Sequence, residues 1–198
     1  MQNQQLYDFA PASADDLIRL ATAAVSEGQA RLEEVLETLP TPIYVTDADG
    51  WVIYFNRACI DFAGRTPISG EDRWCVTWRL YNEQGLPLPH DQCPMATAIR
   101  ENRAIRGVVA IAERPDGTRV MFTPCPSPVY DSAGRLIGAV NLLIDVTDER
   151  QSAALKTQAR RCRRLAQTVS DSRTVATLLG MAAEYEDKAR TLQPRQPA

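Results

Sequence analysis

The N-terminal segment carries apolar side chains three and four positions apart, which is the spacing of one face of an α-helix. Ser13 is a suitable N-cap with Asp16 as a weak capping-box partner, and Pro40 and Pro42 end the pattern. The sequence therefore predicts a helix over 13–39, about 40 Å long, which is more than a small domain can cover. We expect its apolar stripe to pack against a second copy of the chain. The stripe consists of Leu17, Leu20, Ala21, Ala24, Val25, Leu32, Val35, Leu36 and Leu39.

From Pro42 onward the apolar positions follow the shorter period of β-strands. Two such runs, 42–46 and 51–56, flank a turn of sequence Asp-Ala-Asp-Gly and predict a β-hairpin. Short helical pieces and loops rich in proline and glycine occupy the next segment, 57–102. Because hairpin links produce antiparallel sheets, we expect an α+β fold with five antiparallel strands and helices on one face. The three later strands are predicted at 107–112, 119–123 and 136–145.

The C-terminal segment returns to a helical pattern. Residues 153–167 are rich in alanine and arginine, and Ser170 or Asp171 can cap a further helix. The apolar seam of that helix spans about two and a half heptads, which is too short for an independent coiled coil but suits a helical hairpin or a bundle. The seam consists of Val175, Leu178, Ala182, Tyr185, Ala189 and Leu192.

Composition changes this picture little, whereas the distribution of charge adds to it. The chain has 198 residues, 44% of them hydrophobic, and a net charge of −3. Residues 1–40 carry 2 basic and 7 acidic side chains, whereas residues 150–198 carry 10 basic and 4 acidic ones. The acidic front and the basic tail can therefore attract each other, within one molecule or across a dimer.

The sequence gives no sign of export or of a membrane span. No stretch approaches the roughly 20 apolar residues that cross a bilayer, and the N-terminus lacks the basic start and apolar run of a signal peptide. The five cysteines are scattered, which is typical of reduced thiols, so we expect a cytoplasmic protein.

Four stretches, taken together in this order and spacing, resemble a PAS sensor domain. They are the hairpin and following residues 43–58, the segment 85–96, Asp116-Gly117-Thr118, and the final strand with its exit, 138–150. The resemblance implies a PAS fold over 32–150, flanked by an N-terminal helical extension over 1–31 and a C-terminal helical tail over 151–198. It also implies a stand-alone, bacterial type of signalling protein.

Members of this family bind a small ligand between sheet and helices, or serve as dimer contacts, and the fold does not decide between these uses. At the exit from the last strand, Asp145 and Thr147 can hydrogen-bond backbone groups where strand becomes helix. We therefore expect these two residues to relay a change in the sheet to the tail.

His90 is the single histidine of the chain, and its position argues against catalysis. A histidine kinase needs a phosphoacceptor histidine on a long helix, whereas His90 lies between Pro89 and Asp91. The sequence has no Walker loop, no diguanylate cyclase motif and no nucleophile elbow. We therefore expect a protein that is not an enzyme.

Haem is an alternative cofactor, because a neutral imidazole can bind its iron and His90 falls near the region that carries the axial histidine of haem-binding PAS domains. Cys93-Pro94 also matches a short motif of some haem-responsive proteins. Against haem, the flanking prolines predict a loop, and the distal arginine is missing from its expected place, with Arg106 nearby. His90 as a loop or surface residue is the competing interpretation.

Flavin photochemistry has less support, because the surroundings of Cys59 and Cys75 do not match the light-oxygen-voltage motif. The cysteines also lack the paired spacing of a zinc site, so we expect buried, apolar thiols.

Aromatic residues of the middle segment can line a ligand pocket or can simply close the core. We name as pocket candidates Tyr54, Trp74, Trp78, Val109, Met121 and Asn141.

A cluster of arginines, Arg160, Arg161, Arg163 and Arg164, surrounds Cys162 in the tail. No helix-turn-helix pattern accompanies it, and the chain is acidic overall, so nucleic acid is not an expected partner. A solvated face, or a surface for acidic helices, is the favoured interpretation.

Together these observations predict a homodimeric PAS sensor that passes a signal from a small ligand or partner to its helical extensions. Its cofactor is unknown, with haem as the named alternative, and a kinase or response regulator is the expected class of downstream partner. A ligand-free PAS scaffold for protein–protein interaction is the rival hypothesis.

Overall fold

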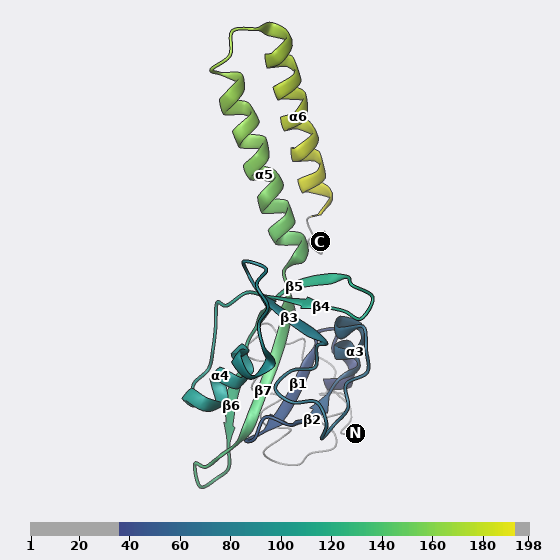
Figure 1. Ribbon diagram of the computed structural model, residues 1–198, viewed down its shortest axis with the longest axis vertical. Coiled ribbons are helices and arrows are strands. Elements are labelled where there is room, and N and C mark those ends of the chain that lie inside the picture. The colour runs from purple at the N-terminus through teal and green to yellow at the C-terminus, as the bar shows by residue number, and fades with distance from the viewer. Residues whose placement is uncertain (1–35, 193–198) are drawn as a thin grey trace, which may run out of the picture. The chain divides into compact units, whose positions relative to one another are not determined.

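The computed structural model describes residues 36–192 (Figure 1). Two compact units divide between Ile144 and Asp145, a few residues before the predicted end of the central domain. The helix predicted over 13–39 lies almost entirely outside the described residues, and so does the interface predicted for its stripe. Residues 36–38 are helical.

The first unit is built on a seven-stranded sheet in the order β2-β1-β7-β5-β4-β3, with β6 beside β7. The pairs β1–β2, β1–β7, β3–β4, β4–β5 and β6–β7 are antiparallel. The strands are β1 (Ile43–Asp47), β2 (Val52–Phe55), β3 (Arg79–Asn82), β4 (Ala110–Glu113), β5 (Arg119–Pro124), β6 (Ser127–Tyr130) and β7 (Leu136–Asp145). The predicted α+β class with an antiparallel sheet is confirmed.

The prediction of five strands is wrong, because β3 and β6 are additional. Each is short and has a mixed sequence, Arg-Leu-Tyr-Asn in β3 and Ser-Pro-Val-Tyr in β6, and each becomes a strand by pairing with β4 or β7. β3 lies inside the segment interpreted as helical and loop-like. The strand predicted from residue 107 begins at Ala110.

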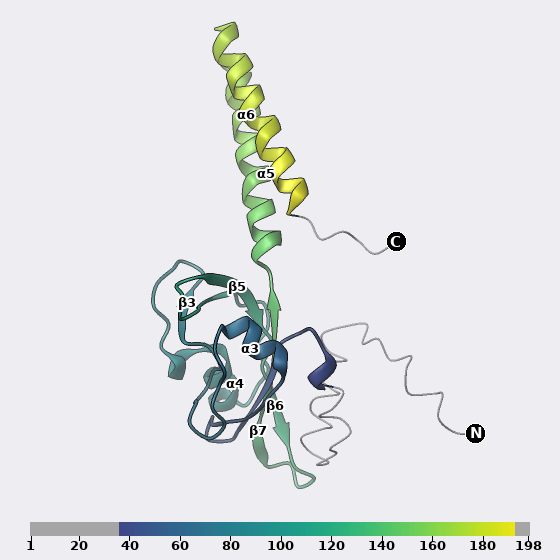
Figure 2. The same ribbon diagram turned by 90° about the vertical axis from the view of Figure 1, so that its right-hand side faces the viewer.

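Two short helices and a 3₁₀ turn cover one face of the sheet: α3 (Arg57–Ala63), η1 (His90–Gln92) and α4 (Pro94–Glu101) (Figure 2). The core on this face contains Phe62 of α3 and Met95 of α4, packed with Tyr44, Leu80 and Phe122 of the sheet. The rings of Phe62 and Phe122 meet edge to face with centroids 5.1 Å apart.

A smaller apolar cluster lies on the opposite face of the sheet, where Leu36 packs with Ile43, Val45, Val140 and Leu142. The buried Asn56 holds the chain at this point. Its Oδ1 accepts a hydrogen bond from the amide of Ile43, and its Nδ2 donates to the carbonyls of Leu36 and Thr41, at 2.9–3.0 Å. In the described part of the chain, an apolar cluster therefore covers each face of the sheet.

The second unit is an antiparallel pair of helices, α5 (Thr147–Ala166) and α6 (Ser172–Thr191) (Figures 1 and 2). Asp171 caps α6 by accepting a hydrogen bond from the amide of Thr174 at 2.8 Å. Arg163 forms a two-pronged ion pair with Glu186. The predicted helical hairpin is thus confirmed. Among the described residues, no helix is both long and apolar enough to cross a bilayer.

Candidate functional site

A buried chain of polar groups crosses the core between sheet and helices. The amide Nδ2 of Asn141, in the middle of β7, donates to the hydroxyl of Tyr44 at 3.0 Å, and that hydroxyl donates to the carbonyl of Trp74 at 3.0 Å. The Oδ1 of Asn141 accepts from the amide of Cys125 at 2.9 Å. Burial raises the pKa of the Tyr44 phenol well above its ordinary value, so this hydroxyl stays protonated and able to donate.

Trp74 occupies an unusual backbone conformation, with φ of 69°. Bulky residues rarely adopt this left-handed region, and where they do the surroundings must hold them there. The amide of Trp74 donates to the carbonyl of Gly50 at 2.7 Å, and a Cβ added to Gly50 would lie 2.2 Å from the indole ring. The guanidinium of Arg73 lies over the rings of Trp51 and Trp74, at 5.1 and 4.9 Å. These contacts fix Trp74 against the turn between β1 and β2.

Three buried thiols lie in the same core cluster as Tyr44. The Cys75 thiol lies 3.1 Å from the hydroxyl of Thr77, and the Cys93 thiol donates to the carbonyl of Trp74 at 3.8 Å. Burial raises the pKa of Cys93 to about 12 and also raises the pKa values of Cys59 and Cys75. Thiols of this kind are protonated and poorly nucleophilic at neutral pH.

All five cysteines are free and buried. Within residues 36–192, no three histidine, cysteine or acidic side chains are grouped to hold a metal ion.

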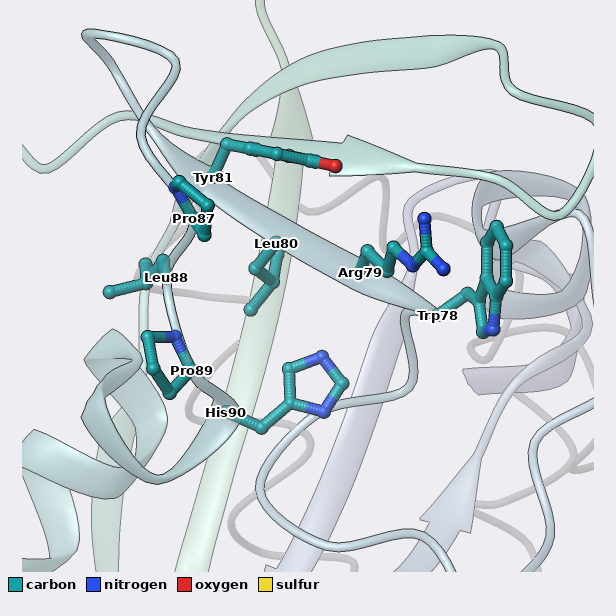
Figure 3. Close-up of a pocket in the computed structure, with 8 residues that line it drawn as sticks. All are labelled: Trp78, Arg79, Leu80, Tyr81, Pro87, Leu88, Pro89 and His90. Atoms are coloured by element: carbon teal, nitrogen blue, oxygen red, sulfur yellow. The ribbon is translucent and has the colours of Figure 1, made fainter.

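A shallow groove of about 300 Å³ runs beside β3 (Figure 3). One wall is β3 with the preceding Trp78, and the other is the segment 87–90. In Figure 3, the side chains of Leu80 and His90 both point into the space between the walls. The lining consists of Trp78, Arg79, Leu80, Tyr81, Pro87, Leu88, Pro89 and His90.

Two arginines and one carboxylate organise the aromatic side of the groove. The guanidinium of Arg79 lies 4.1 Å from the ring of Trp78, and that of Arg119 lies 4.2 Å from the ring of Tyr81. Glu113 pairs with both arginines, at 3.5 and 2.7 Å. The rings are therefore held by cation–π contacts on the outer surface of the sheet.

The segment opposite β3 also closes the edge of the sheet. The amide of Leu88 donates to the carbonyl of Leu80 at 2.8 Å, and the amide of Asn82 donates to the carbonyl of Leu86 at 2.9 Å. Pro87 and Pro89 have no amide hydrogen, so this segment cannot continue a hydrogen-bond ladder through those positions. The groove is therefore bounded by an edge protected against strand addition.

Burial lowers the pKa of His90, opposed by the charge of Asp72 and assisted by that of Arg65. The imidazole is therefore neutral at pH 7 and can both donate and accept a hydrogen bond. His90 is the first residue of η1, outside α4.

These residues do not fit haem. A neutral imidazole suits iron, but a shallow groove at the small end of the range of ligand pockets gives no slot for a large macrocycle. The haem hypothesis stays a prediction, to be checked by an absorption spectrum.

The structure distributes the predicted pocket residues over three places. Trp74 and Asn141 meet through Tyr44 in the core, while Trp78 lies in the groove with His90. Tyr54 packs against the cluster on the opposite face, and its hydroxyl donates to Glu37 at 3.2 Å.

Two further candidates, Met121 and Val109, are not among the residues that line the groove beside β3. Met121 alternates with the core residues Val120 and Phe122, so it faces away from the helices. Val109 is buried just before β4. Of the six candidates, Trp78 is the one that lines the groove beside β3, and the role of the others stays a prediction.

Sequence reasoning missed Tyr44, Leu80 and the prolines of the groove. Tyr44 had a signal, because a tyrosine in a strand of otherwise apolar residues needs a partner for its hydroxyl when buried. Leu80 had no such signal, because the sequence did not predict the strand β3 that carries it.

Asp145 and Thr147 lie at the beginning of the second unit. Asp145 is the last residue of β7, and Thr147 is the first residue of α5. The Oδ1 of Asp145 accepts a hydrogen bond from the amide of Thr147 at 2.9 Å. This bond satisfies one of the free amides of the helix start. The contact is local, and the relay role of the two residues stays a prediction.

Residues 36–151 match a family model described as PAS fold. A comparison with curated protein sequences gives no match.

Several solved structures are similar to parts of the chain. An RNA-binding light-oxygen-voltage receptor is 24% identical, with a TM-score of 0.48, over 63% of this chain and 34% of its own. The chain thus spans about a third of that receptor. The light-oxygen-voltage domain of a blue-light activated histidine kinase from Erythrobacter litoralis is 21% identical, with a TM-score of 0.43, over 55% and 98%. A PAS domain from Colwellia psychrerythraea is 16% identical, with a TM-score of 0.41, over 59% and 95%.

Proposed function

The chain belongs to the PAS fold family, and on that premise we propose that it is a non-enzymatic sensor. In this proposal a small molecule binds in the groove beside β3, and the change passes to the helical hairpin of a homodimer. A kinase or response regulator is the class of partner that would read the hairpin.

The groove favours a ligand with a flat, largely apolar body and one hydrogen-bonding group. Trp78 and Tyr81 offer aromatic surface, Leu80 and the prolines offer apolar surface, and His90 offers a neutral donor or acceptor. A volume of about 300 Å³ suits a compact molecule.

The observation that carries the proposal is the carbonyl of Trp74, which accepts hydrogen bonds from two directions. Cys93, directly after η1 and three residues from His90, donates to it at 3.8 Å. Tyr44 donates to it at 3.0 Å and is itself bound by Asn141 of β7. A ligand that shifts the segment containing His90 therefore acts on the same atom that anchors the centre of β7.

The same carbonyl belongs to Trp74, whose backbone is in the left-handed region, and in the proposal this residue is the one that adopts a second arrangement. β7 continues along the chain into α5 through Asp145 and Thr147. In the proposal, release of Trp74 loosens the bond to Tyr44 and frees β7 to move at its exit.

The test uses the full chain and looks for the ligand directly. Protein is purified, its bound small molecules are extracted under denaturing conditions, and the extracts are compared by mass spectrometry. We expect a compound that accompanies the wild type and is lost from Trp78→Ala and from His90→Ala. Tyr54→Phe, on the opposite face, is the matched control and should retain it. If the compound is lost from all three variants, or is retained in all three, the proposal that it binds in the groove is wrong.

A wild-type extract without any such compound, together with no thermal shift in a panel of compact uncharged aromatic molecules, favours the ligand-free scaffold. An absorption spectrum after addition of haem checks the remaining alternative. From the shape of the groove we expect no Soret band that depends on His90.

A further inference from the structure

The two helices of the hairpin meet along a seven-residue repeat. Buried positions on both helices are three, four or seven residues apart: Ser152, Ala159, Cys162 and Ala166 on α5, and Ala182 and Ala189 on α6. With these as the a and d positions, the e and b positions lie on one flank of the seam and the g and c positions on the other. Arg163 and Glu186 are both e positions, and their ion pair shows that the e flanks of the two helices coincide.

The two flanks have different chemistry. The e and b flank is highly charged and partly neutralised by its own ion pair, with Lys156, Arg160, Arg163, Leu179, Glu186 and Arg190. The g and c flank is mostly uncharged: its charged residues are Arg161, Glu184 and Lys188, and its other residues include Gln158, Leu165, Thr177 and Met181. We call this second surface the docking flank.

Apolar and charged side chains of the docking flank remain exposed when α5 and α6 pack together. Leu165 and Met181 are 46% and 40% exposed. Arg161 and Glu184 are also exposed, and neither makes an ion pair with another described residue. Within the described part of the second unit, residues 145–192, the helices are α5 and α6, and neither covers this surface of the other.

Opposite members of the docking flank lie at matching heights. Cys162 packs with Ala182, so residues just before Cys162 on α5 are level with residues just after Ala182 on α6. Arg161 is therefore level with Glu184, and Leu165 lies within one helical turn of the height of Met181.

We propose that the docking flank is the surface on which a second copy of the chain binds, forming a four-helix bundle. A two-fold axis parallel to the helices places α5 against α6 of the partner and keeps every height unchanged. Arg161 then faces the partner's Glu184, and Leu165 faces the partner's Met181. The symmetry repeats both contacts.

The charges select this arrangement over the other two-fold axis. An axis across the helices would place α5 against α5 of the partner, and an axis at the height of Arg161 would bring Arg161 towards the partner's Arg161, which is a like-charge contact. The inference rests on the homodimer of the proposed function and gives it an interface, but it does not depend on a ligand in the groove.

The test measures dimer dissociation of the full chain by analytical ultracentrifugation at low ionic strength. Arg161→Glu and Glu184→Arg should each weaken the dimer about tenfold, since each places like charges across the interface twice. The double variant exchanges the charges and should return to within about threefold of the wild type. Arg160→Glu changes the neighbouring arginine on the other flank and should have little effect.

A second set of variants tests the apolar centre. Leu165→Ala and Met181→Ala should weaken the dimer, whereas Leu179→Ala, an equally exposed side chain on the other flank, should not. Circular dichroism confirms that each variant keeps its helices.

Two results overturn the inference in distinguishable ways. A wild-type chain that is monomeric at micromolar concentration removes both this interface and the homodimer, and leaves the ligand groove standing. A dimer that Arg161→Glu and Arg160→Glu weaken equally, or that the double variant does not restore, removes this interface alone.

Discussion

The sheet unit buries aromatic and long aliphatic side chains, whereas the hairpin buries alanine, serine and cysteine. Tyr44, Met95 and Phe122 fill the centre of the sheet unit, and a polar chain through Asn141 fixes their arrangement. In the hairpin, small side chains let α5 and α6 approach closely but remove little apolar surface from water. Among the described residues, the sheet unit thus has a larger apolar core than the hairpin.

This difference has a consequence for where each function resides. A rigid core can hold a strained residue such as Trp74 and a preformed groove. A pair of helices with exposed Leu165 and Met181 is suited to association. The same contrast predicts how strongly substitutions act in each unit.

The largest effect is expected from Phe122→Ala, which removes a ring packed against Phe62. We expect the free energy of unfolding of the sheet unit to fall by about 3–5 kcal/mol. Leu179→Ala, on the exposed flank of α6, should change it by less than about 0.5 kcal/mol. Urea unfolding followed by tryptophan fluorescence reports on this unit, because all three tryptophans lie in it. Similar losses in both variants would contradict the contrast.

Gly50→Ala should have the next largest effect. A left-handed backbone costs alanine about 1–2 kcal/mol, and the new Cβ would also collide with the indole of Trp74. Gly85→Ala is the matched control, because its φ is similarly positive but nothing lies near its Cβ position. Urea unfolding should show a clearly greater loss for Gly50→Ala. Equal losses would mean that the turn does not hold Trp74.

A smaller, local effect is expected from Asp145→Ala, which removes one hydrogen bond at the start of α5. The loss should be about 1 kcal/mol, enough to fray the first turn without unfolding the sheet. Amide exchange measured by mass spectrometry should rise in 146–152, while β1 and β5 keep their protection. A rise throughout the sheet would assign Asp145 to core stability.

The smallest effect concerns pH. Because burial lowers the pKa of His90, the folded chain binds fewer protons at this site than the unfolded chain as the pH falls below about 6.5. The stability contributed by the neutral imidazole is present above that pH and is lost as the pH falls through the folded pKa. The Tm of His90→Gln should therefore fall less than the Tm of the wild type when the pH is lowered from 7 to 5. An identical decline would mean that His90 is not buried against the groove.

Much of the fold could be predicted from the sequence because its signals are local. The β1–β2 hairpin has a turn sequence between two alternating runs, and α6 has a cap at Asp171 followed by a heptad seam. β3 could not be predicted, since it becomes a strand through pairing with the distant β4, and β6 was missed because Pro128 interrupts its strand pattern.

The candidate site was less predictable, because its parts come from separate segments. Trp74, Trp78, His90 and Asn141 were named, but their grouping depends on where the loop between α3 and β3 crosses the sheet. The link between them is Tyr44, whose importance follows from a hydrogen bond 97 positions along the chain. No local pattern carries that information.

The most direct test of the account is amide exchange in Tyr44→Phe, which removes the hydroxyl between Trp74 and Asn141 and little else. We predict exchange about fivefold faster in 72–77 and in 139–147, the equivalent of about 1 kcal/mol, with β3 and β4 unchanged. Tyr54→Phe removes a tyrosine hydroxyl on the opposite face and should leave both segments as in the wild type. If the two variants give the same exchange pattern, or if Tyr44→Phe raises exchange in all strands equally, Tyr44 does not connect Trp74 to β7 and the proposed route of the signal is wrong.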